Sequence, residues 1–207
     1  MKHQTQHHSL RHFILLVTLL YLLPVLAVLG GVVPFSLRSA MLLLMFAFAL
    51  MYSHRHGHTA GELGLRTSNL PKAIGVNILA GIAGAGLVIL LPIPGMPEQS
   101  LKTPAVAFFF FYILISSPVQ EFLFRSFLFA EMQRCGIGSP LLQVMISAVL
   151  FAFLHAVYLD PLTGLLSFAA GIMWSIIYQR IPNLAGVSLS HAIIGIMAIM
   201  SGIARKI

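Results

Sequence analysis

The sequence predicts an all-α protein, a polytopic bundle of about seven transmembrane helices, within a range of about six to eight. Three observations predict this class. Of the 207 residues, 58% are hydrophobic and 8% are charged, which leaves too little polar surface to cover a soluble globule of this size. The apolar residues gather in stretches long enough to cross a bilayer, and prolines, glycines and basic residues separate these stretches. No repeat or second domain is visible, so we treat residues 1–207 as a single integral-membrane domain.

The first half of the chain is predicted to hold a tail and three spans. Residues 1–12 form a basic tail, which we expect to be cytoplasmic. The apolar stretch after it has no small-x-small cleavage site, so we interpret it as an uncleaved span rather than a signal peptide. The third span carries glycines and alanines at spacings that let helices approach closely, so we expect it to be a packing helix. These three spans are expected at residues 13–29, at 39–52 with a start near 35, and at 71–91.

The second half is predicted to hold four more spans. The fourth is longer than a bilayer requires, and Pro118 halfway along it predicts a kink, because proline removes a helical hydrogen bond. The seventh ends just before the basic pair Arg205 and Lys206. The four spans are expected at residues 104–134, 140–157, 161–178 and 183–201.

The net charge of +7 would suggest nucleic acid as the partner of a soluble protein. Here the basic residues stand at the ends of apolar stretches, so we expect no nucleic acid and instead a bilayer with anionic headgroups. The Lys and Arg bias favours a cytoplasmic N-terminus. With seven spans Arg205 and Lys206 fall on the opposite side, so the last segment is re-entrant or the number of spans differs by one. The single Cys135 excludes an internal disulfide.

Ionisable side chains inside the predicted spans mark the candidate site. A charge at the bilayer centre costs about 2.5–3.5 kcal/mol on insertion scales, so such residues indicate function. Glu121 and Arg125 are four residues apart in the fourth span and can neutralise each other on one helix face. His155 ends the fifth span and His191 lies in the seventh.

The helical rise predicts that these groups meet. Glu121 and His155 each lie about 20 Å from the connected ends of two antiparallel helices, and His191 lies about 12 Å along the last one. A carboxylate and two imidazoles in one cavity indicate a general base, an orienting partner and an electrophile for attack of water on a carbonyl. The same groups would also serve a proton relay or a zinc site.

Other histidines are less informative. Four are scattered along the tail, and three alternate in the loop after the second span, which we expect to be hydrated. These histidines are His3, His7, His8, His12, His54, His56 and His58. We predict no metal and no cofactor for the chain.

Three short motifs resemble those of a known family. Gln120-Glu121-x-x-x-Arg125, Phe151-x-x-x-His155 and His191 with Gly195 four residues later follow one another along the chain. In order and spacing they resemble the Glu-Glu-x-x-x-Arg, Phe-x-x-x-His and His-x-x-x-Asn motifs of the CAAX prenyl protease and bacteriocin-processing family. The resemblance covers about residues 101–199. The fragment Glu62-Leu63-Gly64-Leu65-Arg66 is similar to a stretch of bacterial members, so we expect the bacterial inner membrane.

The resemblance implies a glutamate-type intramembrane endopeptidase without a metal, acting on a membrane-associated or lipid-modified peptide or protein. In this family a Glu and the first His activate water, the second His and the Asn polarise the scissile carbonyl, and the Arg is a structural clamp. Carried onto this sequence, the catalytic residues are Glu121, His155 and His191. The clamp and the residues lining the site are Arg125, Gln120, Phe151 and Gly195.

Two departures from the motifs leave alternatives open. Gln120 stands where the family has its first Glu, and an amide cannot take a proton from water. Gly195 replaces the Asn and removes one donor to the oxyanion, a loss that typically costs about 10²- to 10³-fold in rate. A catalytically silent relative that acts as a membrane binding, scaffold or immunity protein is therefore the second reading, and a small proton-coupled transporter is the third. The sequence does not predict an oligomeric state.

Overall fold

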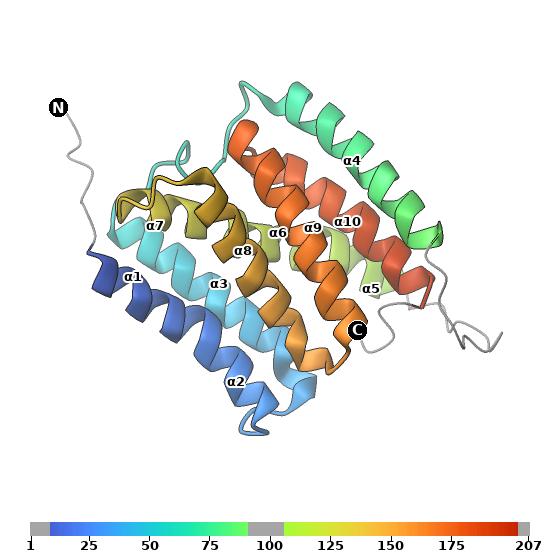
Figure 1. The fold of residues 1–207 in the computed structure, drawn as a ribbon, viewed down its shortest axis with the longest axis horizontal. Coiled ribbons are helices and arrows are strands. Elements are labelled where there is room, and N and C mark those ends of the chain that lie inside the picture. The colour runs from blue at the N-terminus through green and yellow to red at the C-terminus, as the bar shows by residue number, and fades with distance from the viewer. Residues whose placement is uncertain (1–8, 91–105, 203–207) are drawn as a thin grey trace.

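The computed structural model describes residues 9–90 and 106–202, and within these residues all regular structure is helical (Figure 1). Residues 1–8 of the predicted tail, the expected start of the fourth span at 104, and Arg205 and Lys206 lie outside the described residues. The all-α polytopic class predicted from the sequence is confirmed. This protein is an integral, multi-pass membrane protein.

The predicted spans are present as helices in the described part of the chain. Six helical stretches there are long and apolar enough to cross a membrane, and the seventh, Leu184–Met200, is shorter at 17 residues. The elements are α1 (Leu10–Val17), η1 (Thr18–Leu22), α2 (Leu23–Leu29), η2 (Phe35–Leu37), α3 (Arg38–Arg55), α4 (Leu70–Leu90), α5 (Val106–Phe111), η3 (Tyr112–Ser116), α6 (Ser117–Glu121), η4 (Phe122–Phe127), α7 (Leu128–Arg134), α8 (Pro140–His155), η5 (Ala156–Tyr158), α9 (Pro161–Arg180) and α10 (Leu184–Met200).

The helix formed by α6, η4 and α7 is the centre of the bundle. Every residue from Ser126 to Met132 is buried, and Leu123, Phe127 and Leu128 have no exposed surface. A helix buried on all sides must be enclosed by neighbours rather than by lipid. The charged segment of the sequence therefore lies in the interior of the protein.

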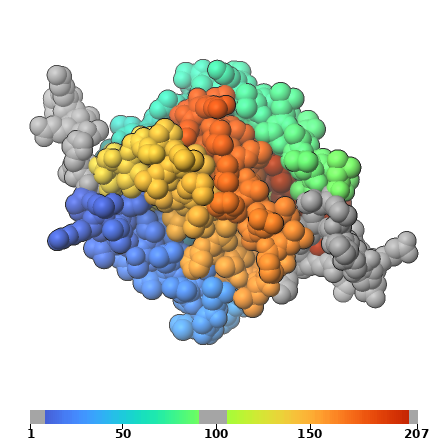
Figure 2. Space-filling model, in the orientation of Figure 1, coloured from blue at the N-terminus to red at the C-terminus, as the bar shows by residue number. Residues whose placement is uncertain are grey.

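The remaining helices enclose this centre. Figure 1 shows α1, α2 and α3 on one side of the bundle and α4 with α10 on the other. In Figure 2, α8 and α9 cover the middle of the visible face between these two groups. Helices α4 and α10 pack along each other, as do α8 and α9, and α10 also packs on α6.

Small residues bring two helix pairs close together. A Cβ added to Gly186 of α10 would lie 2.8 Å from the Asn77 amide nitrogen and 3.1 Å from the Ala73 carbonyl oxygen of α4. Buried Asn77 also accepts a hydrogen bond from the Ser190 hydroxyl at 2.8 Å. In the other pair, a Cβ on Gly171 of α9 would lie 3.0 Å from the Ala148 Cα of α8. The structure confirms the third span as a packing helix.

Both prolines inside the long spans follow a π-helical turn. Pro24 is the second residue after η1, and Pro118 is the second residue after η3. Such wide turns accommodate a missing donor and occur frequently at functional sites. The kink predicted at Pro118 thus takes the form of a π-turn, and a second π-turn, η4, begins immediately after Glu121.

The loop after α3 is held on the end of α7. Arg134 donates to Glu62 Oε1 at 3.0 Å and to the carbonyl oxygens of His56 and Gly57 at 2.7 and 3.2 Å. Partial burial raises the pKa of Glu62, but hydrogen bonds from Thr59 and the charge of Arg134 outweigh it, so the pKa lies below its usual value. This segment closes one end of the bundle.

The expectation of a hydrated loop is wrong for one of its histidines. The side chain of His58 is fully buried, and its Nε2 lies 2.8 Å from Oε1 of the buried Glu131. A buried carboxylate needs a partner of this kind, because desolvation without one is costly. The tertiary fold therefore pulls His58 inward, away from solvent.

Candidate active site

Glu121 and Arg125 form the predicted pair in the centre of the bundle. Both side chains have no exposed surface. Arg125 Nη1 donates to Glu121 Oε1 at 3.3 Å, and Arg125 Nε lies 3.3 Å from Oε2. The two charges thus neutralise each other across one helical turn, as the four-residue spacing predicts.

Arg125 is held on its other faces as well. Its Nη2 donates to the Gly171 carbonyl oxygen at 3.3 Å. The guanidinium carbon lies 4.5 Å from the ring centroid of Phe151 and 5.4 Å from that of Trp174. Ring faces attract a cation through their quadrupole, so the contacts fix Arg125 between α6, α8 and α9. This geometry fits a clamp.

His191 binds the carboxylate of the pair. Its Nδ1 lies 2.6 Å from Glu121 Oε1, and its ring stacks on Trp174 with the centroids 4.4 Å apart and the planes at 10°. A carboxylate acceptor fixes the proton of the neutral ring on Nδ1 and leaves Nε2 as the second functional nitrogen. Glu121 therefore sets both the tautomer and the orientation of His191.

His155 is oriented by a backbone carbonyl. Its Nδ1 lies 2.8 Å from the Phe151 carbonyl oxygen, one turn earlier in α8. A carbonyl only accepts, so Nδ1 of His155 is the donor, and the lone pair of the neutral ring is on Nε2. In the described part of the chain, the Glu121 carboxylate bonds to His191 and Arg125 and not to His155.

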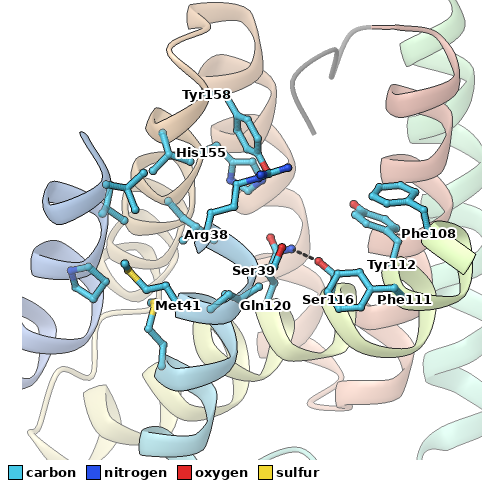
Figure 3. Close-up of a pocket in the computed structure, with 17 residues that line it drawn as sticks. Arg38, Ser39, Met41, Phe108, Phe111, Tyr112, Ser116, Gln120, His155 and Tyr158 are labelled. Atoms are coloured by element: carbon cyan, nitrogen blue, oxygen red, sulfur yellow. Dashed lines mark hydrogen bonds between the residues drawn. The ribbon is translucent and has the colours of Figure 1, made fainter. Parts of the chain in front are cut away.

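Gln120 lies in a different environment from its neighbour Glu121. Its Nε2 donates to Ser116 Oγ at 3.0 Å, while its Oε1 is buried without a hydrogen-bond partner. Gln120 and His155 line one cavity, which α2 and α3 border on the other side (Figure 3). The side chains of these two adjacent residues therefore point in different directions: Gln120 faces this cavity, and Glu121 faces Arg125.

A second cavity adjoins the first. His155 and Tyr112 line both cavities, whereas His191 and Gly195 line only the second. The two imidazoles thus face a common space across Phe151, whose ring centroid lies 4.6 Å from that of His155 and 5.7 Å from that of His191.

Gly195 leaves room for the phenol of Tyr112. A Cβ added at Gly195 would overlap the Tyr112 hydroxyl oxygen. The ring of Tyr112 also approaches that of His191, with 6.0 Å between centroids. A tyrosine hydroxyl therefore stands beside the backbone position where the resembling motif has an Asn side chain.

Sequence reasoning missed Tyr112 and Arg38, which also lines the first cavity. A signal existed for Tyr112: with Ser116 and Gln120 it forms a row of polar side chains four residues apart, which share one helix face. Arg38 gave no such signal, because a basic residue at the start of a span normally marks the membrane interface. Among the described residues, no group of three or more His, Cys, Asp or Glu is placed to hold a metal ion.

We compared the chain with known protein families, curated proteins and solved structures. Residues 102–197 match the family model described as type II CAAX prenyl endopeptidase Rce1-like. No curated protein and no solved structure matched the chain. The matched segment contains all three motifs, from Gln120 to Gly195. Residues 102–197 of this protein therefore belong to the Rce1-like family of type II CAAX prenyl endopeptidases, which confirms the family predicted from the motifs.

Proposed function

We propose that this protein is an intramembrane endopeptidase that hydrolyses a peptide bond of a membrane-associated or lipid-modified peptide or protein. Family membership supports a CAAX-type protease at a coarse level. The observation that carries the finer proposal is the pair of fixed imidazoles, His155 and His191, around adjoining cavities inside the bundle. Each has its Nδ1 occupied, which leaves Nε2 for chemistry.

In the proposed reaction, His155 takes a proton from water at Nε2 while the water oxygen attacks the scissile carbonyl carbon. The resulting oxyanion receives hydrogen bonds from the Tyr112 hydroxyl and from Nε2–H of His191 in its doubly protonated form. When the carbon–nitrogen bond breaks, the protonated His155 returns its proton to the leaving nitrogen. Atoms and charges balance without a further reactant.

Glu121 acts in this scheme through His191. Its carboxylate stabilises the charged form of that ring, and Arg125 keeps the carboxylate in place. The role expected from the sequence, in which Glu121 itself takes the proton from water, stays a prediction. It requires the carboxylate to reach the side of the helix on which Gln120 and His155 lie.

The proposed setting is the bacterial inner membrane with a cytoplasmic N-terminus. The Lys and Arg bias of the sequence supports this orientation, and anionic headgroups are the proposed lipid partners.

The test is cleavage of lipid-modified peptides by the purified protein in vesicles, followed by mass spectrometry. We expect His155→Ala, His191→Ala and Glu121→Gln each to reduce cleavage by about 10²- to 10⁴-fold, the usual contribution of general acid–base groups. His54→Ala is the matched control, because His54 is exposed at the end of α3, far along the chain from the motifs. Cleavage at wild-type rate by His155→Ala would contradict the proposal.

A silent relative remains the second candidate. The observation that favours it is the amide of Gln120 in the cavity together with the engagement of Glu121 by Arg125 and His191. A silent protein would retain a lipid-modified peptide in the vesicle assay without cutting it, and the Gln120→Glu variant would also leave the peptide intact.

A further inference from the structure

The first cavity carries an unbalanced positive charge. Among the residues that line it, Arg38 is the one with a permanent charge, and none is acidic. In the described residues, no carboxylate pairs with Arg38. Its Nη1 instead donates to the Phe35 carbonyl oxygen at 3.2 Å, and its guanidinium carbon lies 4.2 Å from the Phe35 ring. The Tyr158 side chain is a second hydrogen-bond partner of Arg38. Because a guanidinium has five donors, others stay available to a ligand.

Arg38 lies near the candidate catalytic histidine. Its guanidinium carbon is 6.0 Å from the Tyr158 ring centroid, which is 5.9 Å from that of His155, so the two groups are at most about 12 Å apart. Figure 3 shows the Arg38 side chain extending from α3 towards Tyr158 and His155. A molecule that is bound by Arg38 and extends about 12 Å can therefore reach His155 as well.

The rest of the cavity is suited to an apolar chain. Met41, Leu42 and Met45 of α3 form part of one wall, and Phe108 and Phe111 of α5 form part of the opposite one. The lining thus combines a cation at one end with an apolar body.

A second polar group lacks a partner in this cavity. Gln120 is 7% exposed, and its Oε1 has no hydrogen-bond partner among the described residues. Buried polar atoms are nearly always hydrogen-bonded, so an orphan of this kind indicates a group that arrives from outside. An amide N–H of a bound peptide supplies a suitable donor.

We propose that this cavity binds an amphiphile with an oxyanion head, a carboxylate or a phosphate, and that Arg38 is the residue that selects it. The guanidinium fork matches both oxyanions, and the apolar walls take the chain. This names the substrate class of the endopeptidase site and rests on that proposal. Arg38 lies outside residues 102–197, so the selecting residue is separate from the segment that carries the motifs.

The test measures binding and needs no cleavage, so it can fail independently of the proposed function. Trp174 is the single tryptophan of the chain and lines the adjoining cavity, so quenching of its fluorescence by chain-brominated amphiphiles reports binding. Three probes with the same chain are used in non-ionic micelles: a carboxylate, a monoalkyl phosphate and an alcohol. We expect the wild-type protein to bind at least one anionic probe about 10- to 100-fold more tightly than the alcohol.

Variants assign this preference to one residue. In Arg38→Gln, the affinity for the anionic probe should fall to within about twofold of that for the alcohol probe. Arg38→Lys should keep part of the difference, because lysine retains the positive charge but lacks the two-pronged guanidinium. Arg55→Gln is the matched control at the opposite, exposed end of α3 and should keep the full preference. Equal binding of all three probes by the wild-type protein, or an unchanged preference in Arg38→Gln, overturns the proposal.

The two anionic probes distinguish the source of the oxyanion. Tighter binding of the carboxylate identifies the free end of a peptide or acyl chain, and tighter binding of the phosphate identifies a phospholipid headgroup. Either result supports selection by Arg38 if the Arg38→Gln variant loses the preference for the anionic probe over the alcohol.

Discussion

Gln120 and Glu121 are neighbours in sequence, but their side chains lie in different surroundings. Replacing Gln120 by Glu places a carboxylate in the cavity with His155 and retains a hydrogen bond to Ser116, now donated by the serine. We expect Gln120→Glu to preserve cleavage or raise it, by up to about 10²- to 10⁴-fold if a base is lacking. The measurement is kcat on a lipid-modified peptide.

The control for this change is Gln133→Glu, which adds the same charge at an exposed position of the same long helix. A loss of cleavage in a folded Gln120→Glu protein, with Gln133→Glu unaffected, would show that the cavity of Gln120 and His155 is not where water is activated.

Tyr112 is the residue that the structure adds to the site. Its hydroxyl fills the space that the missing Cβ of Gly195 leaves open. We expect Tyr112→Phe to lower kcat by about 10²- to 10³-fold with little change in KM, the result of removing an oxyanion donor. Tyr21→Phe is the control, because it removes another buried hydroxyl, one that donates to the Leu123 carbonyl oxygen at 2.6 Å. An unchanged kcat in Tyr112→Phe would remove it from the mechanism.

At the scale of helices, the contact between α4 and α10 depends on Gly186. A Cβ there would meet the Ala73 backbone and the Asn77 amide, neither of which can yield easily. We expect Gly186→Ala to destabilise the protein by about 1–3 kcal/mol through forced separation of the helices. Gly75→Ala on α4 is the control, because a Cβ at Gly75 would meet nothing within 4 Å. Thermal unfolding in detergent compares the two, and equal midpoints would contradict close packing at Gly186.

Helix periodicity explains which parts of the site could be predicted. The Glu121–Arg125 contact follows from a four-residue spacing within one helix, and the structure contains it. The Glu121–His191 contact joins residues 70 apart in the sequence, so no local pattern encodes it. The depth of these groups along the spans predicted that they would converge. It did not predict that Glu121 would contact His191 while Gln120 and His155 line a separate cavity. The π-turns on either side of α6 change the angular phase of the helix, which a 3.6-residue period does not anticipate.

The same limit applies to the loop after α3. Its polar composition predicted hydration, but the buried carboxylate of Glu131 draws in His58 from a distant part of the chain. Local composition does not reveal an interaction between a histidine and a buried carboxylate that are far apart in the sequence. The number and order of the spans, in contrast, follow from apolar length alone, which is why the fold class was predictable.

At the scale of the whole molecule, the Glu62–Arg134 pair ties the loop to the end of the central helix. Because the pKa of Glu62 is lower in the folded state than its ordinary value of 4.5, its contribution to stability is complete above that value. The contribution is lost as the pH falls through the folded-state pKa. We therefore expect the gap in unfolding midpoint between wild type and Glu62→Gln to shrink as the pH falls from about 6 to about 3.

The control for the pH series is Arg55→Gln, which removes an exposed cation near the loop without touching a carboxylate. A gap that stays constant over the acid range would mean that the Glu62 carboxylate does not stabilise the folded state.

The two walls of the first cavity come from different parts of the chain. Gln120 and His155 lie in the segment with the family match, whereas Arg38 and Met41 lie in the N-terminal helical hairpin outside it. If Arg38 selects the ligand as proposed, recognition and bond cleavage depend on different segments of the chain. On that proposal, exchange of the N-terminal hairpin changes which ligand is bound and leaves the residues of the three motifs unchanged.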